Sequence, residues 1–257
     1  MKSKATITYQ KAGFVGSITI DRPDNGNAIN TQLSEELADI CLSINQDETV
    51  RVVVITGAGE KHFCVGTDST LLSSMAKEQR IELLSVTSSI LSINQPVIGA
   101  INGDALGQGL EMALACDIRI AAETARLGLS QIASGFIPWD GGTQLLPRIV
   151  GKTKAAELIF TGETLDARQA CEIGLVGKVL PAKELMPTVM EIAQAMSLKA
   201  PIALRHTKEA VHKGLDLTLE QGLRLEADLY LLLQTTEDRV EGIKAFLERR
   251  QPQFKGR

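Results

Sequence analysis

The stretch Leu106-Gly107-Gln108-Gly109-Leu110-Glu111-Met112-Ala113-Leu114-Ala115-Cys116-Asp117 carries one carboxylate in the middle of an apolar run. From Leu110 to Cys116 every residue except Glu111 is apolar, and Ala, Leu and Met are strong helix formers, so the run predicts a short buried helix. A carboxyl group in apolar surroundings tends to have a raised pKa and needs hydrogen-bond partners. Glu111 therefore belongs either to a buried hydrogen-bonded structure or to acid/base chemistry.

The residues before this helix predict a sharp turn out of a strand. Val97–Ile101 is a short apolar run typical of a buried strand, and Asn102-Gly103-Asp104 is a turn sequence. Gly107 and Gly109 bracket the helix start, where backbone N–H groups can hold a developing negative charge. One interpretation is half of an oxyanion hole, a set of N–H donors for an anionic oxygen. The other is that the glycines serve only tight packing of the helix on the strand.

Composition excludes several classes of protein. The chain has 257 residues, a formal net charge of −4, 44% hydrophobic and 23% charged residues, which is typical of an ordinary globular protein. It has no basic run for nucleic acid, and no apolar run approaches the roughly 20 residues that span a membrane. The amino end lacks a signal-peptide pattern, so we expect a cytoplasmic location. Scattered cysteines without CxxC spacing, and three histidines without a cluster, predict neither a disulfide framework nor a metal site.

Strand and helix patterns recur along the chain without a linker between them. Alternating or continuous apolar runs predict strands at 5–9, 15–20, 50–57, 97–101 and 118–122, and the 50–57 run is apolar enough to be covered on both faces. Helical patterns begin at about Thr31 and at Leu71, the second ending at Ile93. We interpret this order as one α/β domain of stacked β–β–α units. Beyond Gly151 the pattern is mostly helical, at 155–160, 167–173, 184–196, 201–213, 219–234 and 237–249.

The loop Gly57–Asp68 follows the most strand-like run of the chain. Ligands bind at the carboxyl ends of strands in open α/β sheets. This loop and the Gly107 turn are therefore the two segments that we expect to meet at a site.

Several motifs, in order along essentially the whole chain, resemble the crotonase (enoyl-CoA hydratase/isomerase) family. They are Asn27–Asn30, Phe63–Asp68, Pro96–Gly103, Gly107–Glu111, Ala115–Ile118, Gly128–Gln131, Ile137–Gln144, Thr161-Gly162, Gly174–Val176 and Phe246. The resemblance implies a crotonase-like spiral of ββα units over residues 1–195. It also implies a helical carboxyl-terminal region, 196–257, that forms trimers. The substrate it implies is an acyl-CoA thioester, with coenzyme A as part of the substrate and no separate cofactor.

The resemblance also assigns catalytic positions. Thr67 and Gln108 match the two residues whose backbone N–H groups hold the thioester oxygen, and such donors lower the barrier to an enolate by roughly 3 kcal/mol each. Glu111 matches the first glutamate of the hydratases, which activates water. The second falls on Gln131, which forms hydrogen bonds but cannot exchange a proton as a carboxylate does. Asp140 supplies the missing acid/base group in one interpretation, and caps a helix in a surface loop in the other.

The remaining family positions are predicted to bind substrate. Val65 and Asp68 fall on the CoA-binding loop, and Trp139 replaces a small residue beside the acyl group. Phe246 and Arg249 match a helix that closes over the nucleotide, from the same or a neighbouring subunit.

Three functions follow from these residues. The leading hypothesis is a lyase that hydrates an α,β-unsaturated acyl-CoA, and Gln131 with Trp139 suggests an unusual substrate such as a dienoyl-CoA or alicyclic dienoyl-CoA. The second is a double-bond isomerase that uses Glu111 with Asp140. The third is a non-catalytic acyl-CoA-binding subunit, against which a buried carboxylate argues.

Overall fold

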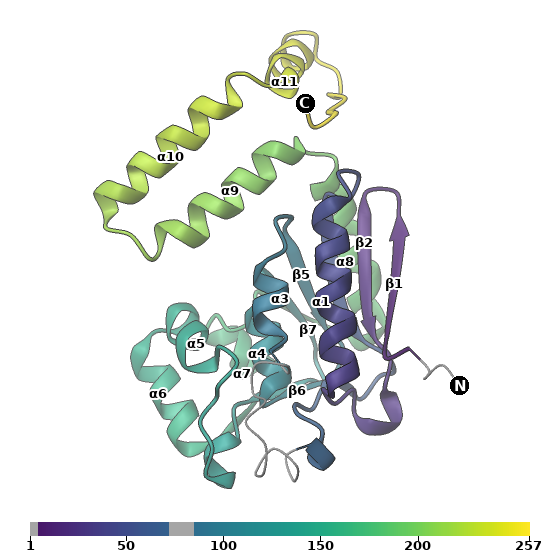
Figure 1. Ribbon diagram of the computed structural model, residues 1–257, viewed down its shortest axis with the longest axis vertical. Coiled ribbons are helices and arrows are strands. Elements are labelled where there is room, and N and C mark those ends of the chain that lie inside the picture. Colours follow the sequence, from purple (N-terminus) through teal and green to yellow (C-terminus); the bar gives the residue numbers. More distant parts are fainter. Residues whose placement is uncertain (1–4, 72–84) are drawn as a thin grey trace.

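The computed structural model describes residues 5–71 and 85–257 (Figure 1). Its larger sheet has the strand order β1-β2-β3-β5-β7-β10, and its smaller sheet has the order β4-β6-β8-β9. The strands of the larger sheet are Ile7–Ala12, Val15–Ile20, Val52–Gly57, Val97–Ile101, Ile118–Ala122 and Lys178–Leu180. Those of the smaller sheet are His62–Cys64, Asp104–Leu106, Arg126–Gly128 and Thr164–Asp166. All strand predictions for the larger sheet are confirmed, although β10 and the short strands of the smaller sheet were not predicted.

The strand β3 explains why one run of the chain is apolar throughout. Successive side chains of a strand point to opposite faces. Val53 and Ile55 accordingly lie in one hydrophobic core, whereas Val52 and Val54 lie in the other. Helix α1 (Thr31–Gln46) covers the first face and α8 (Ala182–Ser197) covers the second. Burial on both faces is what the sequence predicts for this strand.

The strands repeat in pairs. In β3/β4, β5/β6 and β7/β8 the first strand enters the larger sheet and the second enters the smaller sheet. Helix α4 (Gln108–Leu114) follows the second pair, and the 3-10 helix η3 (Gln131–Ser134) follows the third. This confirms the stacked β–β–α arrangement. The helix predicted for 71–93 lies largely outside the described residues. In its described part the chain forms α3 (Thr87–Leu91).

The smaller sheet brings three chain segments to one edge. Strand β6 pairs in parallel with β4 on one side and with β8 on the other. The carboxyl ends of these three strands therefore lie side by side. The residues that follow them are Val65–Thr67, Gly107-Gln108 and Leu129–Gln131.

The second half of the chain is mostly helical, as predicted. The helices are α5 (Gly142–Val150), α6 (Lys152–Thr161), α7 (Ala167–Glu172), α8, α9 (Pro201–Gly214), α10 (Leu219–Leu233) and α11 (Glu237–Leu247). Asp166 accepts the backbone N–H of Gln169 and is the N-cap residue of α7.

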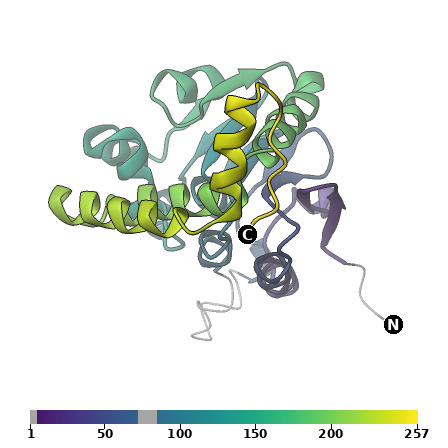
Figure 2. The ribbon, with the colours of Figure 1, turned by 90° about the horizontal axis from the view of Figure 1, so that it is seen from above.

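Helices α9 to α11 extend away from the two sheets in Figure 1, and α9 packs against α10 in both views (Figure 2). The extension begins with α9 at Pro201, whereas the predicted boundary between 195 and 196 falls in the last turn of α8; this division of the chain stays a prediction. Asp117 fastens α9 to the larger sheet, because its carboxylate lies 2.9 Å from Lys208 Nζ and 2.7 Å from His212 Nε2. Among the described residues no helix is long and apolar enough to cross a membrane.

Candidate active site

Glu111 lies in the middle of α4 with no solvent exposure. Its Oε1 accepts the backbone N–H groups of Asp140 (2.9 Å) and Gly142 (2.8 Å), and its Oε2 accepts the side-chain amide of Gln131 (3.1 Å). The donors come from η3, from the start of α5 and from the loop between them. The carboxylate predicted from the apolar run is therefore both buried and held by three donors.

Burial raises the pKa of Glu111 to about 7, and the nearby charge of Asp140 adds to this rise. The hydrogen bonds from Gly142, Asp140 and Gln131 oppose it, because they stabilise the ionised form. A carboxyl group with a pKa near neutrality is suited to accept and return a proton at physiological pH. The environment therefore fits acid/base chemistry better than a purely structural hydrogen bond.

The predicted oxyanion residues come together at the edge of the smaller sheet. Ile29 N–H donates to Gly66 O (2.8 Å) and Asp68 N–H donates to Ile29 O (2.8 Å). By the alternation of a parallel bridge, the N–H of Thr67 then points away from Ile29. A Cβ on Gly66 would stand 3.3 Å from Gln108 N, so the two segments are in contact.

The start of α4 needs a glycine for its position. A Cβ on Gly109 would stand 2.0 Å from Cys64 O, which no real Cβ tolerates. Tight packing of helix on strand is therefore one real function of this glycine. The same packing places Gln108, the first residue of α4, in the turn whose N–H groups have no intrahelical acceptor.

Asp140 is buried rather than part of a surface loop. Its Oδ1 accepts Ser85 Oγ (2.7 Å), and its Oδ2 accepts the N–H groups of Val86 (2.9 Å) and Thr87 (3.3 Å) and the side-chain amide of Gln108 (3.0 Å). The carboxylate thus caps the start of α3, as one of the two interpretations expects, but it does so across the fold and beside Gln108.

The comparisons with known proteins agree with this geometry. The family model described as enoyl-CoA hydratase/isomerase matches residues 10–257. The chain belongs to the enoyl-CoA hydratase/isomerase family. The crotonyl-CoA hydratase of Syntrophomonas wolfei is 36% identical over 96% of this chain and 97% of its own length. The 2,3-dehydroadipyl-CoA hydratase of Escherichia coli K12 is 39% identical over 93% of this chain and 94% of its own length.

A solved structure of this family has nearly the same fold. The crystal structure of an enoyl-CoA hydratase from Bacillus anthracis has a TM-score of 0.95 and 42% identity, and the match covers 98% of this chain and 100% of that one. The predicted family, crotonase-like fold and hydratase-type enzyme class are confirmed. The trimerisation of the carboxyl-terminal region stays a prediction.

The other residues predicted to bind substrate are not all near Glu111 in one chain of this hydratase/isomerase. Val65 and Asp68 flank Thr67, and Asp68 forms an ion pair with Arg22 (3.0 Å), so its carboxylate already has a partner. Trp139 is half-buried, next to Asp140. Phe246 is 82% exposed on α11, which lies far from α4 along the longest axis (Figure 1), and Arg249 is exposed just after it. These last two positions suit contact with a neighbouring subunit.

Sequence reasoning missed two parts of the site. The N–H of Gly142 is a donor to Glu111, and a Cβ at Gly142 would stand 3.0 Å from Glu111 Oε1. The pair Gly141-Gly142 after Asp140 was the available signal for such a close approach. Ser85, which donates to Asp140, lies inside the helical pattern predicted for 71–93 and had no such signal.

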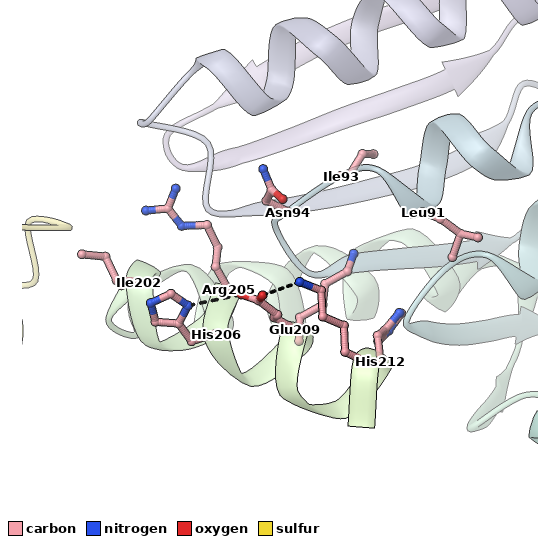
Figure 3. A pocket seen from close by; sticks show the side chains of 10 residues that line it. Leu91, Ile93, Asn94, Ile202, Arg205, His206, Glu209 and His212 are labelled. Atoms are coloured by element: carbon pink, nitrogen blue, oxygen red, sulfur yellow. Dashed lines mark hydrogen bonds and ion pairs between the residues drawn. The ribbon is translucent and has the colours of Figure 1, made fainter. Parts of the chain in front are cut away.

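A separate open pocket of about 600 Å³ lies between α3 and α9 (Figure 3). Four of its five basic residues have carboxylate partners: His206 and Lys213 pair with Glu209, and Lys208 and His212 pair with Asp117. Their arrangement is explained by the docking of α9. In the described part of the chain no group of three or more His, Cys, Asp or Glu residues is placed to hold a metal ion.

Proposed function

We propose that this enzyme adds water across the double bond of a 2-enoyl-CoA thioester, with Glu111 as the only carboxyl group that exchanges a proton. The observation that carries the proposal is the buried carboxyl group of Glu111, whose pKa is raised to about 7. It lies near the two contacting segments that bear Thr67 and Gln108. The names of the crotonyl-CoA and 2,3-dehydroadipyl-CoA hydratases support hydration as the reaction. Coenzyme A is part of the substrate, and no separate cofactor takes part.

In the first step the backbone N–H groups of Thr67 and Gln108 bind the thioester oxygen. Ionised Glu111 removes a proton from water while the water oxygen bonds to the β-carbon. The π electrons of the double bond move to the thioester oxygen and form an enolate, whose charge the two N–H donors stabilise.

In the second step the enolate takes a proton at its α-carbon and the thioester carbonyl is restored. Gln131 cannot supply this proton, since its amide is not an acid at neutral pH. Glu111 carries the proton taken from water and returns it, so that all atoms of one water enter the product. Gln131 holds Oε2 of Glu111 at 3.1 Å and thereby orients the carboxyl group.

The acyl group is the finer part of the proposal. Trp139 is half-buried beside Asp140, where the family resemblance places a small residue. A flat indole ring is suited to stack on a conjugated or cyclic acyl group. We therefore favour a dienoyl or alicyclic dienoyl thioester over a straight saturated chain beyond the double bond.

We also propose that the enzyme is a homotrimer or a dimer of trimers. Helices α10 and α11 expose large apolar side chains in the single chain, including Leu219, Leu223, Leu231, Leu232, Phe246 and Leu247. A second copy of the chain is the simplest cover for such a surface. Light scattering during gel filtration should give the mass of three or six chains, and a monomer at micromolar concentration would contradict this.

The test of the reaction is mass spectrometry with separation of isomers, using straight 2-enoyl, 3-enoyl and cyclic dienoyl thioesters of CoA. The expected product is heavier than the substrate by one water, and Glu111→Gln should form it about 100- to 10,000-fold more slowly. A rearranged product of unchanged mass would instead identify an isomerase. Bound CoA thioester without any product would identify a binding subunit.

A further inference from the structure

The side chain of Gln108 joins the two halves of the site. Its Oε1 accepts the hydroxyl of Thr67 at 2.7 Å, and its Nε2 donates to Asp140 Oδ2 at 3.0 Å. Gln108 is 2% exposed and Asp140 is 5% exposed, so both bonds are shielded from water. A glutamine amide has one acceptor end and one donor end, and here each end faces the matching partner.

This chain of hydrogen bonds fixes the direction of each proton. Both oxygens of the Asp140 side chain accept hydrogen bonds, so the amide nitrogen of Gln108 faces Asp140 and the amide oxygen faces Thr67. The hydroxyl proton of Thr67 is thereby committed to Gln108. The Thr67 hydroxyl is then not a donor to the substrate, and the thioester oxygen depends on backbone N–H groups.

Asp140 connects the same chain to the catalytic base. Its backbone N–H donates to Glu111 Oε1 at 2.9 Å, while its carboxylate accepts Gln108 and the start of α3. Four donors converge on this carboxylate, counting Ser85 and Thr87. A carboxylate offers about four acceptor positions, so those of Asp140 are already used by the protein. The geometry therefore argues against Asp140 as a second acid/base group.

We propose that Gln108 is a positioning residue: its side chain, through Thr67 and Asp140, fixes the two oxyanion N–H donors relative to Glu111. The proposal rests on the proposed function for its reaction, but the contacts stand independently of it. A misplacement of about 1 Å in such a site lowers a rate by as much as 100-fold. Loss of the hydrogen bonds through Gln108 should therefore lower kcat by about 10- to 100-fold, with KM changed by only a few-fold.

The test compares variants that keep shape and remove hydrogen bonds. Gln108→Met and Thr67→Val break this series of hydrogen bonds, whereas Thr67→Ser keeps a hydroxyl and should lose less kcat than Thr67→Val. If both residues act through one chain, the double variant should lose about as much kcat as either single variant. Gln169→Met serves as a matched control, since Gln169 is an exposed residue that closes the capping box of α7.

The second readout is the ultraviolet absorbance of bound acetoacetyl-CoA, whose enolate absorbs where the keto form does not. At saturation the enolate fraction reports the oxyanion donors and is independent of water addition. Gln108→Met and Thr67→Val should lower the ratio of bound enolate to bound keto form by at least about tenfold. A merely structural role would lower the melting temperature and leave this ratio unchanged.

Two results would overturn the proposal: wild-type kcat and enolate ratio in both Gln108→Met and Thr67→Val, or losses that multiply in the double variant. Asp140→Asn should keep kcat within about tenfold of wild type, because an amide oxygen still accepts the N–H groups of α3. A loss beyond about 1,000-fold in Asp140→Asn would assign direct catalysis to Asp140 instead. If the wild type forms bound enolate but hydrates no enoyl-CoA, the proposed function fails while the enolate ratio still decides the role of Gln108.

Discussion

Replacing Glu111 by glutamine should make the protein more stable at alkaline pH, although it removes the proposed base. The carboxyl group is fully buried and its pKa is raised from 4.5 to about 7, so the fold disfavours its ionised form. Glutamine has nearly the same shape and its oxygen still accepts the N–H groups of Asp140 and Gly142. Its NH₂ group can donate to Gln131 once that amide turns over.

The sign and size of this stability change follow from the linkage of proton binding to folding. Between the unfolded and folded pKa values the folded chain binds more protons, so this group makes the protein less stable as pH rises from about 4.5 to about 7. Above that range the full difference, about 3 kcal/mol, opposes folding. Between about pH 5 and about pH 8 the stability of Glu111→Gln should rise relative to wild type by about 2.5 kcal/mol.

The assay is urea unfolding of both proteins at the two pH values and at equal protomer concentration. Glu36→Gln is the control, since hydrogen bonds from Gln32, Thr6 and Ile7 lower the pKa of Glu36. Its stability difference from wild type should therefore change little between the two pH values, which both lie above the unfolded pKa. The stabilisation from Glu36 is present above its unfolded pKa and is lost as pH falls through its folded pKa. A stability difference for Glu111→Gln that does not change with pH would refute the reasoning about burial.

Three further predictions concern the fold. Gly109→Ala should destabilise the protein by about 1–3 kcal/mol, because the new Cβ would meet Cys64 O at 2.0 Å; urea unfolding measures it, and wild-type stability would contradict the packing of α4 on β4. Asp117→Asn should release α9, because Lys208 and His212 of α9 pair with the Asp117 carboxylate. Faster amide hydrogen exchange over 201–214 should show this release. Unchanged exchange would mean that apolar packing alone holds α9. Burial raises the pKa of Cys41, Cys64 and Cys116 to about 12, so these thiols should resist a thiol reagent in the folded protein, whereas half-buried Cys171 should react first; equal reaction of all four would contradict their burial.

The features that the sequence predicts well are those with a strong local pattern. The apolar run of β3 and the strand at Val97–Ile101 needed no tertiary information, because burial on both faces selects continuous apolar residues. The burial of Glu111 could be predicted because its carboxylate stands alone in a continuous apolar run. The short strands β4, β6, β8 and β9 were not predicted, because three residues are too few to show a period.

The features that the sequence could not predict depend on contacts between distant segments. Asp140 lies within hydrogen-bond distance of Ser85 and Gln108 only because the sheets bring these loops together. No local pattern distinguishes such a buried cap from a catalytic acid. The same holds for Gly142, whose N–H contacts a carboxylate 31 positions earlier in the chain.

The most direct test of a single-carboxyl hydratase is the pH dependence of kcat/KM for hydration of crotonyl-CoA, measured for wild type and for Glu111→Gln. The base must be ionised to accept a proton from water, so the wild-type value should rise with pH and level off, with a midpoint at about 7. The variant should be slower by about 100- to 10,000-fold and should lack this midpoint. A variant that keeps wild-type kcat/KM, or the same midpoint, would contradict the assignment of Glu111 as the base.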